Sequence, residues 1–350
     1  MRSIVNDKHL TVCAAMALAQ MFSSPAVNAA PPYRIVKSIA LGAPERWDYA
    51  SFDAARNRVY VAHGDHLAIV DTAKSALLGQ VGTFPGGTHG SAAVPGTSMA
   101  YTDDGEAGVA IAFDPQSLKV LKQIPAAVDA DGIVYDPASG HLFVIEGDSG
   151  SITVIDPKTN AAVATIRVGA GLEAADTDGK GKLFVDGVEQ HDLIAIDTRG
   201  NAVLAHYPLP NCQRPHGIAV DAKTRRVFAT CVNKLMMVVD ADKGTVIAQL
   251  PIGSSSDGAA FDPKRKLALS SNGDGTLTVV KEVDANHFVK LGDMPTQRSA
   301  RTIAIDPATG RVFLPAATIS KIDPPTTSGG RPHVTYVPGS LKLLVLEPTI

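Results

Sequence analysis

Residues 131–168, DGIVYDPASGHLFVIEGDSGSITVIDPKTNAAVATIRV, decide the fold of this 350-residue chain. They hold four short apolar runs, separated by turn-forming stretches such as residues 156–160, DPKTN. Short runs bounded by Pro, Gly, Asp and Asn are typical of β-strands, and none of them has the 3.6-residue period of an amphipathic helix. The segment therefore predicts a unit of four antiparallel strands.

This unit recurs seven times along the chain, with a period of about 42 residues. Each repeat has a polar residue at the start of its first strand, and successive copies lie 41 to 44 residues apart. These seven anchor residues are Asp48, His89, Asp131, Glu173, His216, Asp257 and Arg301. Repeats of this length with four strands each are typical of propeller blades. We therefore expect an all-β fold, a seven-bladed β-propeller.

The seventh repeat has no fourth strand before residue 350, but residues 34–41 have the pattern of one. We expect this N-terminal strand to pair with residues 341–347 and complete the last blade. Such closure removes the open sheet edges that a linear array of repeats would expose.

The composition supports a folded protein and argues against one class of partner. Apolar residues make up 45% of the chain, and 31 glycines and 23 prolines supply turns. The 35 acidic residues slightly outnumber the 32 basic ones, for a net charge of −3. Binding to nucleic acid requires many Lys and Arg side chains, so a nucleic-acid partner is not expected.

Residues 1–30 have the pattern of a signal peptide. Arg2 and Lys8 precede an apolar run over residues 10–22, which is too short to span a bilayer, and small residues follow it. The alternative is a retained N-terminal helix. With cleavage after Ala29 or Ala30, residues 31–350 would form a single domain. We expect this domain to be a periplasmic or secreted monomer without a membrane anchor.

Export affects the interpretation of Cys212 and Cys231, the two cysteines after residue 30. An even number of cysteines in an oxidising compartment favours a disulfide. Cys212 lies four residues before His216, and Cys231 ends the second strand of the same repeat, so an antiparallel hairpin would bring the two together. The alternative is a thiolate pair that joins His216 on a soft metal.

Two second strands with their following turns, residues 59–64 (VYVAHG) and 227–233 (VFATCVN), carry a family resemblance. In them, and in the repeat period over residues 33–348, the chain resembles the YVTN-type β-propeller repeat family of exported bacterial proteins. The resemblance implies a propeller fold. It does not select a function, because relatives include lactonase-like enzymes, surface proteins and proteins without an assigned role.

The anchors are the main candidates for a functional site, because the inner strands of a propeller begin around one mouth of a central channel. Carboxylates and imidazoles suit divalent cations, and crowded carboxylates need a positive partner. We expect a divalent metal cation to be held by Asp48, His89, Asp131, Glu173, His216 and Asp257, with Arg301 facing it. The alternative is that these side chains only solvate a water-filled mouth.

Further candidates lie around the same face. The long connection over residues 316–340 could be a lid that contacts substrate through Arg331 and His333, or an unstructured insertion. Trp47, the single tryptophan, could form an apolar wall or pack between blades. His63, His66 and His191 are less favoured candidates.

Two classes of function fit these patterns. The first is a metal-dependent hydrolase or lyase of a small metabolite, lactonase-like in its most concrete form. In it, His89 or His216 would bind metal or transfer protons, and Arg301 would hold an anionic group. The second is a non-catalytic periplasmic binding or scaffold protein that uses the same face.

Overall fold

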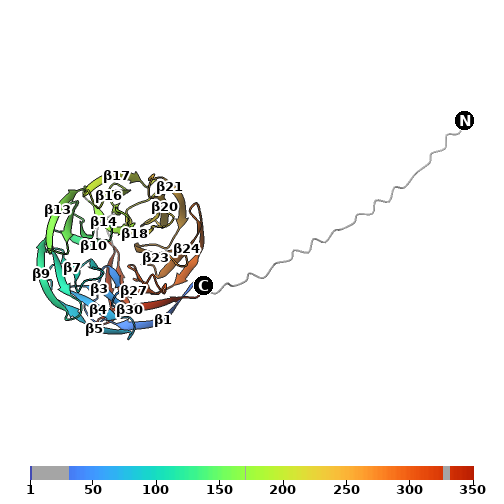
Figure 1. The fold of residues 1–350 in the computed structure, drawn as a ribbon. Coiled ribbons are helices and arrows are strands. Elements are labelled where there is room, and N and C mark those ends of the chain that lie inside the picture. The colour runs from blue at the N-terminus through green and yellow to red at the C-terminus, as the bar shows by residue number, and fades with distance from the viewer. Residues whose placement is uncertain (2–30, 170, 326–331) are drawn as a thin grey trace. The chain divides into compact units, whose positions relative to one another are not determined.

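Seven four-stranded antiparallel sheets are arranged in a ring in the computed structural model (Figure 1). The structure describes Met1 and residues 31–169, 171–325 and 332–350. Residues 31–350 form one compact unit. The predicted signal peptide beyond Met1, and Arg331, lie outside the described residues.

The first three blades, each given from inner to outer strand, are β2 (Ala50–Asp53), β3 (Arg58–His63), β4 (His66–Asp71) and β5 (Ala76–Val81); β6 (Ser91–Ala93), β7 (Ala100–Asp104), β8 (Val109–Asp114) and β9 (Lys119–Pro125); and β10 (Ala130–Asp136), β11 (His141–Glu146), β12 (Ser151–Asp156) and β13 (Ala161–Arg167). Blades four to six are β14 (Leu172–Thr177), β15 (Lys182–Gly187), β16 (Asp192–Asp197) and β17 (Ala202–Pro208); β18 (Pro215–Asp221), β19 (Arg226–Cys231), β20 (Leu235–Asp240) and β21 (Val246–Pro251); and β22 (Ser256–Asp262), β23 (Leu267–Asn272), β24 (Thr276–Asp284) and β25 (His287–Pro295). The seventh blade is β26 (Ala304–Ile305), β27 (Val312–Ala316), β30 (Lys342–Pro348) and β1 (Tyr33–Ala40).

The predicted closure of the ring is confirmed. Strand β1 pairs antiparallel with β30, from Tyr33 opposite Pro348 to Ala40 opposite Lys342, with an irregularity between Ile35 and Lys37. The two ends of the unit therefore form one blade, and the seventh sheet has the same four strands as the others.

Burial explains why the middle strands are continuously apolar while the outer strands alternate. Strands β3 and β4 are buried along almost their whole length, whereas β5 alternates between exposed and half-buried residues. The middle strands pack against neighbouring blades on both faces, so both of their faces must be apolar. The outer strands have one face in water.

The Asp that lies five residues after most anchors holds the turn between the first two strands. In blade one, the Asp53 carboxylate accepts hydrogen bonds from the backbone N–H groups of Ala55 and Arg56, at 3.0 and 3.2 Å. Such an Asx turn replaces backbone hydrogen bonds that the hairpin lacks. Blade two has Val94 at this position. There the Thr97 hydroxyl holds the turn instead, because it donates a hydrogen bond to the Val94 carbonyl and accepts one from the Met99 N–H.

The long connection of blade seven has structure of its own in its described part. Strands β28 (Ile319–Asp323) and β29 (His333–Tyr336) form an antiparallel hairpin. The described part of this connection is therefore a β-hairpin and not an unstructured insertion. Within the part of the chain that the structure describes, no helix is long and apolar enough to cross a membrane.

Candidate functional site

The inner strands of all seven blades converge on a narrow central cavity of about 160 Å³. Neighbouring inner strands come close enough there that glycine is required. A Cβ on Gly90 would lie 2.4 Å from the Asp131 carbonyl oxygen, and one on Gly217 would lie 2.8 Å from the Gly258 backbone. The residues at the starts of these strands are consequently brought toward one mouth.

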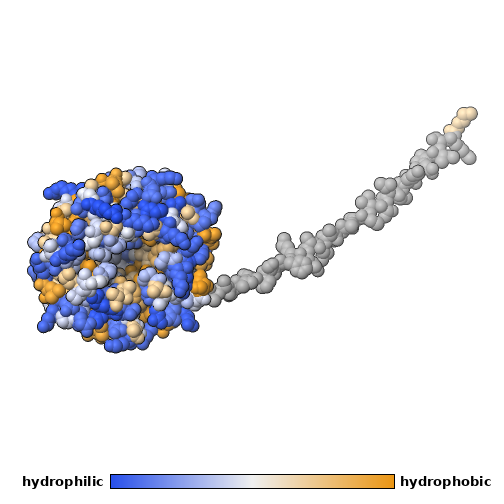
Figure 2. Space-filling view, in the orientation of Figure 1, coloured by the Kyte–Doolittle hydropathy of each residue, from blue (hydrophilic) through white to orange (hydrophobic). Residues whose placement is uncertain are grey.

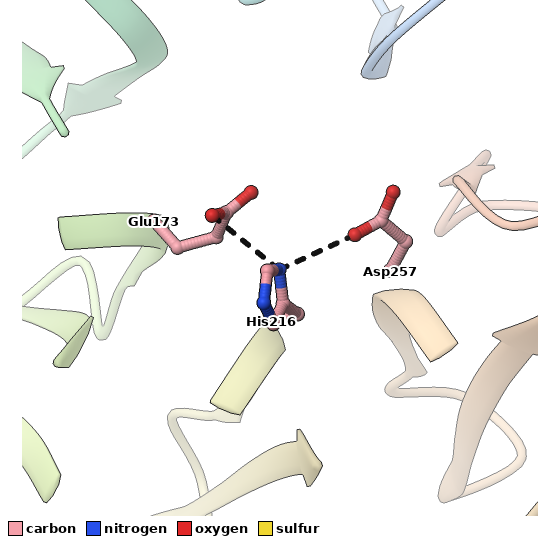
Figure 3. Close-up of side chains that lie close together, drawn as sticks. All are labelled: Glu173, His216 and Asp257. Atoms are coloured by element: carbon pink, nitrogen blue, oxygen red, sulfur yellow. Dashed lines mark ion pairs between the residues drawn. The ribbon is translucent and has the colours of Figure 1, made fainter. Parts of the chain in front are cut away.

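Three anchors from consecutive blades form a cluster at this mouth (Figure 3). Glu173 of β14, His216 of β18 and Asp257 of β22 each place one potential ligand atom within 4.8 Å of the others. His216 Nδ1 lies 3.3 Å from Glu173 Oε2 and 3.4 Å from Asp257 Oδ1. His216 is 4% exposed, and neither of its ring nitrogens has a hydrogen-bond partner among the residues that the structure describes. This cluster is a possible metal-binding site.

The second oxygen of each carboxylate is held by another side chain. The Tyr49 hydroxyl donates to Glu173 Oε1 at 2.8 Å, and Arg301 Nε donates to Asp257 Oδ2 at 2.6 Å. Arg301 also donates to the Trp47 carbonyl oxygen at 2.8 Å. Both carboxylates are thereby oriented with one oxygen toward His216.

The other predicted ligands are not part of this cluster. Among the described residues, the one group of candidate ligands contains neither Asp48 nor His89 nor Asp131. His89 is directed instead toward Asp103, with 3.3 Å between Nδ1 and Oδ1. Metal–ligand bonds measure about 2.0–2.6 Å, so ligand atoms of one site must lie close together, and only three of the six predicted ligands do so here. The structure thus supports a three-residue site where the sequence predicted six ligands.

Burial and neighbouring charges alter the acidities of the mouth residues. Although burial raises it, His216 and Arg301 lower the pKa of Asp257 to about 2. Although burial lowers it, Asp257 and Glu173 raise the pKa of His216 to about 9. Burial raises the pKa of Asp48 to about 7, and burial together with Glu173 raises that of Asp131 well above its usual range. Crowded carboxylates here do disfavour one another's charge, as the sequence predicted.

A pocket of about 530 Å³ lies beside the cluster, within the size range of sites for small molecules. Its lining residues are Arg214, His216, Val232, Ser255, Ser256, Asp257, Arg301, Pro332 and Val334. The last two belong to the hairpin segment, so the hairpin β28–β29 does cover part of the mouth. Figure 2 shows one face of the unit, on which hydrophilic residues predominate.

The two remaining candidates for substrate contact, His333 and Trp47, do not line this pocket. His333 lies between Pro332 and Val334 and does not line the pocket, because successive residues of a strand point to opposite faces. Trp47 is 3% exposed and belongs to an apolar cluster between blades. Its ring packs edge-on against Tyr336 at 5.2 Å, and the Arg301 guanidinium lies 5.0 Å from its centroid. Trp47 therefore packs between blades beside Arg301 and is not among the described residues that line the pocket.

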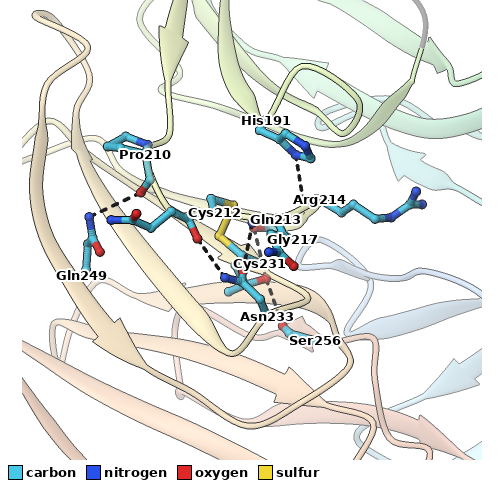
Figure 4. Close-up of a disulfide and its surroundings, with 12 residues drawn as sticks. His191, Pro210, Cys212, Gln213, Arg214, Gly217, Cys231, Asn233, Gln249 and Ser256 are labelled. Atoms are coloured by element: carbon cyan, nitrogen blue, oxygen red, sulfur yellow. Dashed lines mark hydrogen bonds between the residues drawn. A yellow bond between two sulfur atoms is a disulfide. The ribbon is translucent and has the colours of Figure 1, made fainter. Parts of the chain in front are cut away.

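The predicted disulfide between Cys212 and Cys231 is present, with 5.5 Å between the Cα atoms (Figure 4). Since both sulfurs are bonded to each other, they are not thiolate ligands beside His216. Hydrogen bonds also tie this loop to the end of β19: the Gln213 N–H donates to Asn233 Oδ1 at 2.9 Å, and the Asn233 amide donates to the Asn211 carbonyl at 2.8 Å.

The less favoured histidines have structural partners. His63 Nδ1 and His66 Nε2 lie 2.9 Å apart, and His66 Nδ1 lies 2.9 Å from Asp65 Oδ1. His191 Nδ1 accepts a hydrogen bond from the Arg214 N–H at 3.1 Å. None of the three belongs to the cluster around His216.

Sequence reasoning did not single out Tyr49 or Asp103. A signal for Tyr49 did exist, because four of the seven anchors are followed by glycine whereas Asp48 is followed by Tyr49. A large side chain at this narrow position has to extend into the channel, and Tyr49 does so to reach Glu173 from blade one.

Comparisons with known proteins support the fold and nothing narrower. No family model and no curated protein matches the chain. Among solved structures, the chain is similar to hydrazine synthase of Kuenenia stuttgartiensis, with 15% identity, a TM-score of 0.65, and coverage of 83% of this chain and 95% of that one. It is also similar to a chain of the mitotic checkpoint complex, with 13% identity, a TM-score of 0.72, and coverage of 98% and 99%. Fold and site together define a seven-bladed β-propeller with a possible metal-binding cluster at the channel mouth.

Proposed function

We propose that this protein is an exported, metal-dependent hydrolase or lyase, lactonase-like in its chemistry, that acts on a small metabolite. One observation carries the proposal: Glu173, His216 and Asp257 place three ligand atoms within 4.8 Å of one another at the edge of a 530 Å³ pocket. A reaction centre next to a cavity of this size is the usual arrangement for a small-molecule enzyme.

The residues present fit a divalent cation. The buried imidazole of His216 has two carboxylate oxygens facing Nδ1 but no hydrogen-bond partner for Nε2 among the described residues, and a metal bond would satisfy one of these nitrogens. Glu173 Oε2 and Asp257 Oδ1 face the same imidazole, while Tyr49 and Arg301 hold the other carboxylate oxygens. Partners of this kind orient metal ligands and tune their affinity. One imidazole and two carboxylates suit Zn²⁺, Mn²⁺ and similar ions.

A cation bound by three protein ligands would supply a Lewis acid with open positions, able to polarise a carbonyl or activate water. His216 serves as a ligand in this proposal, and His89 is the better candidate for moving a proton. Asp103 accepts hydrogen bonds from the N–H groups of His89 and Gly90, at 2.8 and 2.7 Å, and lies against the His89 ring. A histidine oriented by a buried carboxylate is a common general base.

In this proposal Arg301 acts on a metal ligand. Its guanidinium is engaged by Asp257 and by the Trp47 carbonyl, so it positions a metal ligand instead of holding an anionic substrate group.

Export is part of the proposal. It is supported by the signal-peptide pattern of residues 1–30 and by the disulfide, because disulfides persist mainly in oxidising compartments. We propose that the exported protein is a monomer.

A non-catalytic binding protein is the second candidate, and one observation favours it. Arg301 and a protonated His216 can together balance the carboxylates of Asp257 and Glu173 without a metal. In that case the same pocket would bind a ligand without transforming it.

Elemental analysis combined with melting curves separates the two candidates. Protein expressed from the full sequence should contain about one divalent cation per chain, and a chelator should lower its melting temperature. The variant His216→Ala should lose both properties. His287→Ala, which changes an exposed histidine of β25, should keep both. Metal-free protein with melting curves indifferent to chelator would favour the binding protein.

A further inference from the structure

The pocket beside the cluster has two unlike walls. Arg214, Ser255 and Ser256 contribute polar groups next to His216 and Asp257, whereas Val232, Pro332 and Val334 contribute apolar surface. A ligand that fills both parts of such a pocket must be amphipathic.

The two arginines on the pocket differ in how they are engaged. Arg301 already donates to a carboxylate and to a carbonyl. Arg214 contributes its backbone N–H to His191, and among the residues that the structure describes no carboxylate forms an ion pair with its exposed guanidinium. Among the lining residues that the structure describes, Arg214 is therefore the cation that is available to an incoming anion.

The backbone that carries Arg214 is fixed. Arg214 has a positive φ of 48°, lies two residues after the disulfide-bonded Cys212, and accepts a hydrogen bond from the Val232 N–H at 3.3 Å. This bond places Arg214 directly beside Val232 of the apolar wall. The fixed backbone keeps the Arg214 side chain next to the pocket, and a guanidinium can bond both oxygens of a carboxylate.

We propose that the pocket binds a small amphipathic monocarboxylate, with its carboxylate on Arg214 and its apolar part against Val232, Pro332 and Val334. A single negative charge is specified because the Asp257 carboxylate also lines the pocket and would repel a second one. This inference deepens the proposed function by naming the ligand class. Only the chemical conversion of the bound ligand rests on the proposed function; its binding does not.

Octanoate, its neutral counterpart octanamide, and acetate are suitable probes. Titration calorimetry should show saturable binding of octanoate at least tenfold tighter than that of octanamide, because a hydrogen bond to a charged group contributes about 1.5–3 kcal/mol. Acetate should bind more weakly than octanoate, because it lacks the apolar part. Trp47 gives a second readout: it contacts Arg301 and the hairpin residue Tyr336, so its fluorescence should change on octanoate binding.

Variants assign the binding to the proposed groups. Arg214→Gln should weaken octanoate at least tenfold and leave octanamide unchanged. Arg298→Gln, an exposed arginine of the neighbouring hollow, should change neither. Val334→Ser should weaken octanoate but not acetate. Equal binding of octanoate and octanamide, no effect of Arg214→Gln, or no saturation by octanoate at millimolar concentration would overturn the inference.

Measuring the metal content of the same preparations distinguishes failure of the ligand-binding inference from failure of the proposed metal-dependent function. Arg214→Gln should retain the metal and the chelator response, since Arg214 is not a ligand. Octanoate binding that depends on Arg214 in a protein without metal would sustain the ligand class and contradict the hydrolase.

Discussion

At the scale of single residues, the site depends on the different partners of the two oxygens in each carboxylate of Glu173 and Asp257. Each carboxylate gives one oxygen to a neutral or cationic donor and turns the other toward His216. The Tyr49 hydroxyl can serve as this donor at any physiological pH, because burial, together with Glu173, raises the pKa of Tyr49 well above its usual value.

Replacing Tyr49 by Phe tests this division. The variant removes one hydrogen bond to Glu173 and leaves the aromatic ring in the channel, so the fold should persist. Partners of metal ligands commonly contribute 10- to 100-fold in affinity, and we expect the dissociation constant of the metal to rise roughly tenfold. Titration calorimetry with Zn²⁺ or Mn²⁺ measures it. Tyr207→Phe in the outer strand β17 is the control, and equal affinity of the two variants would remove Tyr49 from the site.

Glu282 of β24 offers a prediction that is independent of the site. It is fully buried, and burial raises its pKa from 4.5 to about 7. An acid whose pKa is raised by folding stays protonated in the folded state while the unfolded state ionises. The free energy of unfolding should therefore fall as pH rises from 4.5 to 7, by on the order of 3 kcal/mol.

Glu282→Gln should remove this contribution. Urea unfolding at pH 5 and pH 8, with chelator present, should show that the variant gains stability relative to the parent protein at the higher pH. A difference between variant and parent that is the same at both pH values would show that Glu282 ionises normally in the folded protein.

At the scale of strands and loops, the chain shows what a sequence can and cannot predict. The alternation and turn residues of each repeat predicted the strands, because burial on one or two faces imposes those patterns directly. The cysteine pairing also followed from local spacing, because Cys212 and Cys231 lie on one hairpin. The hairpin β28–β29 was missed, because its strands are mostly exposed and lack the apolar runs of the blades.

The disulfide should stabilise both the fold and the position of Arg214. It closes a loop with a sequence separation of 19, for which chain entropy gives about 3 kcal/mol. The double variant Cys212→Ser, Cys231→Ser should unfold at a lower urea concentration by about that free energy. It should also bind octanoate more weakly at temperatures where it remains folded. An unchanged unfolding midpoint would show that the bridge does not constrain the chain.

At the scale of the whole molecule, the seven-fold repeat made the ring predictable, since the period sets the blade count and the missing strand sets the closure. The composition of the site was less predictable. Repeat register placed seven anchors at one mouth, but it could not show that Asp131 and His89 lie outside the cluster or that His89 faces Asp103. Those outcomes depend on side-chain directions, which the repeat period does not determine.

Closure predicts the effect of removing strand β1. Deleting residues 31–42 would leave β30 as an open edge in the last blade, and open edges promote association. We expect aggregation or loss of cooperative unfolding, measured by light scattering and calorimetry. A truncated protein that stays monomeric and melts like the parent would show that β1 is dispensable.

The central claim is that Glu173, His216 and Asp257 hold a divalent cation. Anomalous diffraction from crystals soaked in Mn²⁺ tests it most directly. The account predicts one strong anomalous peak within bonding distance of His216, Glu173 Oε2 and Asp257 Oδ1, and no such peak in crystals of His216→Ala. A map without a peak at these three residues in the parent protein would contradict it.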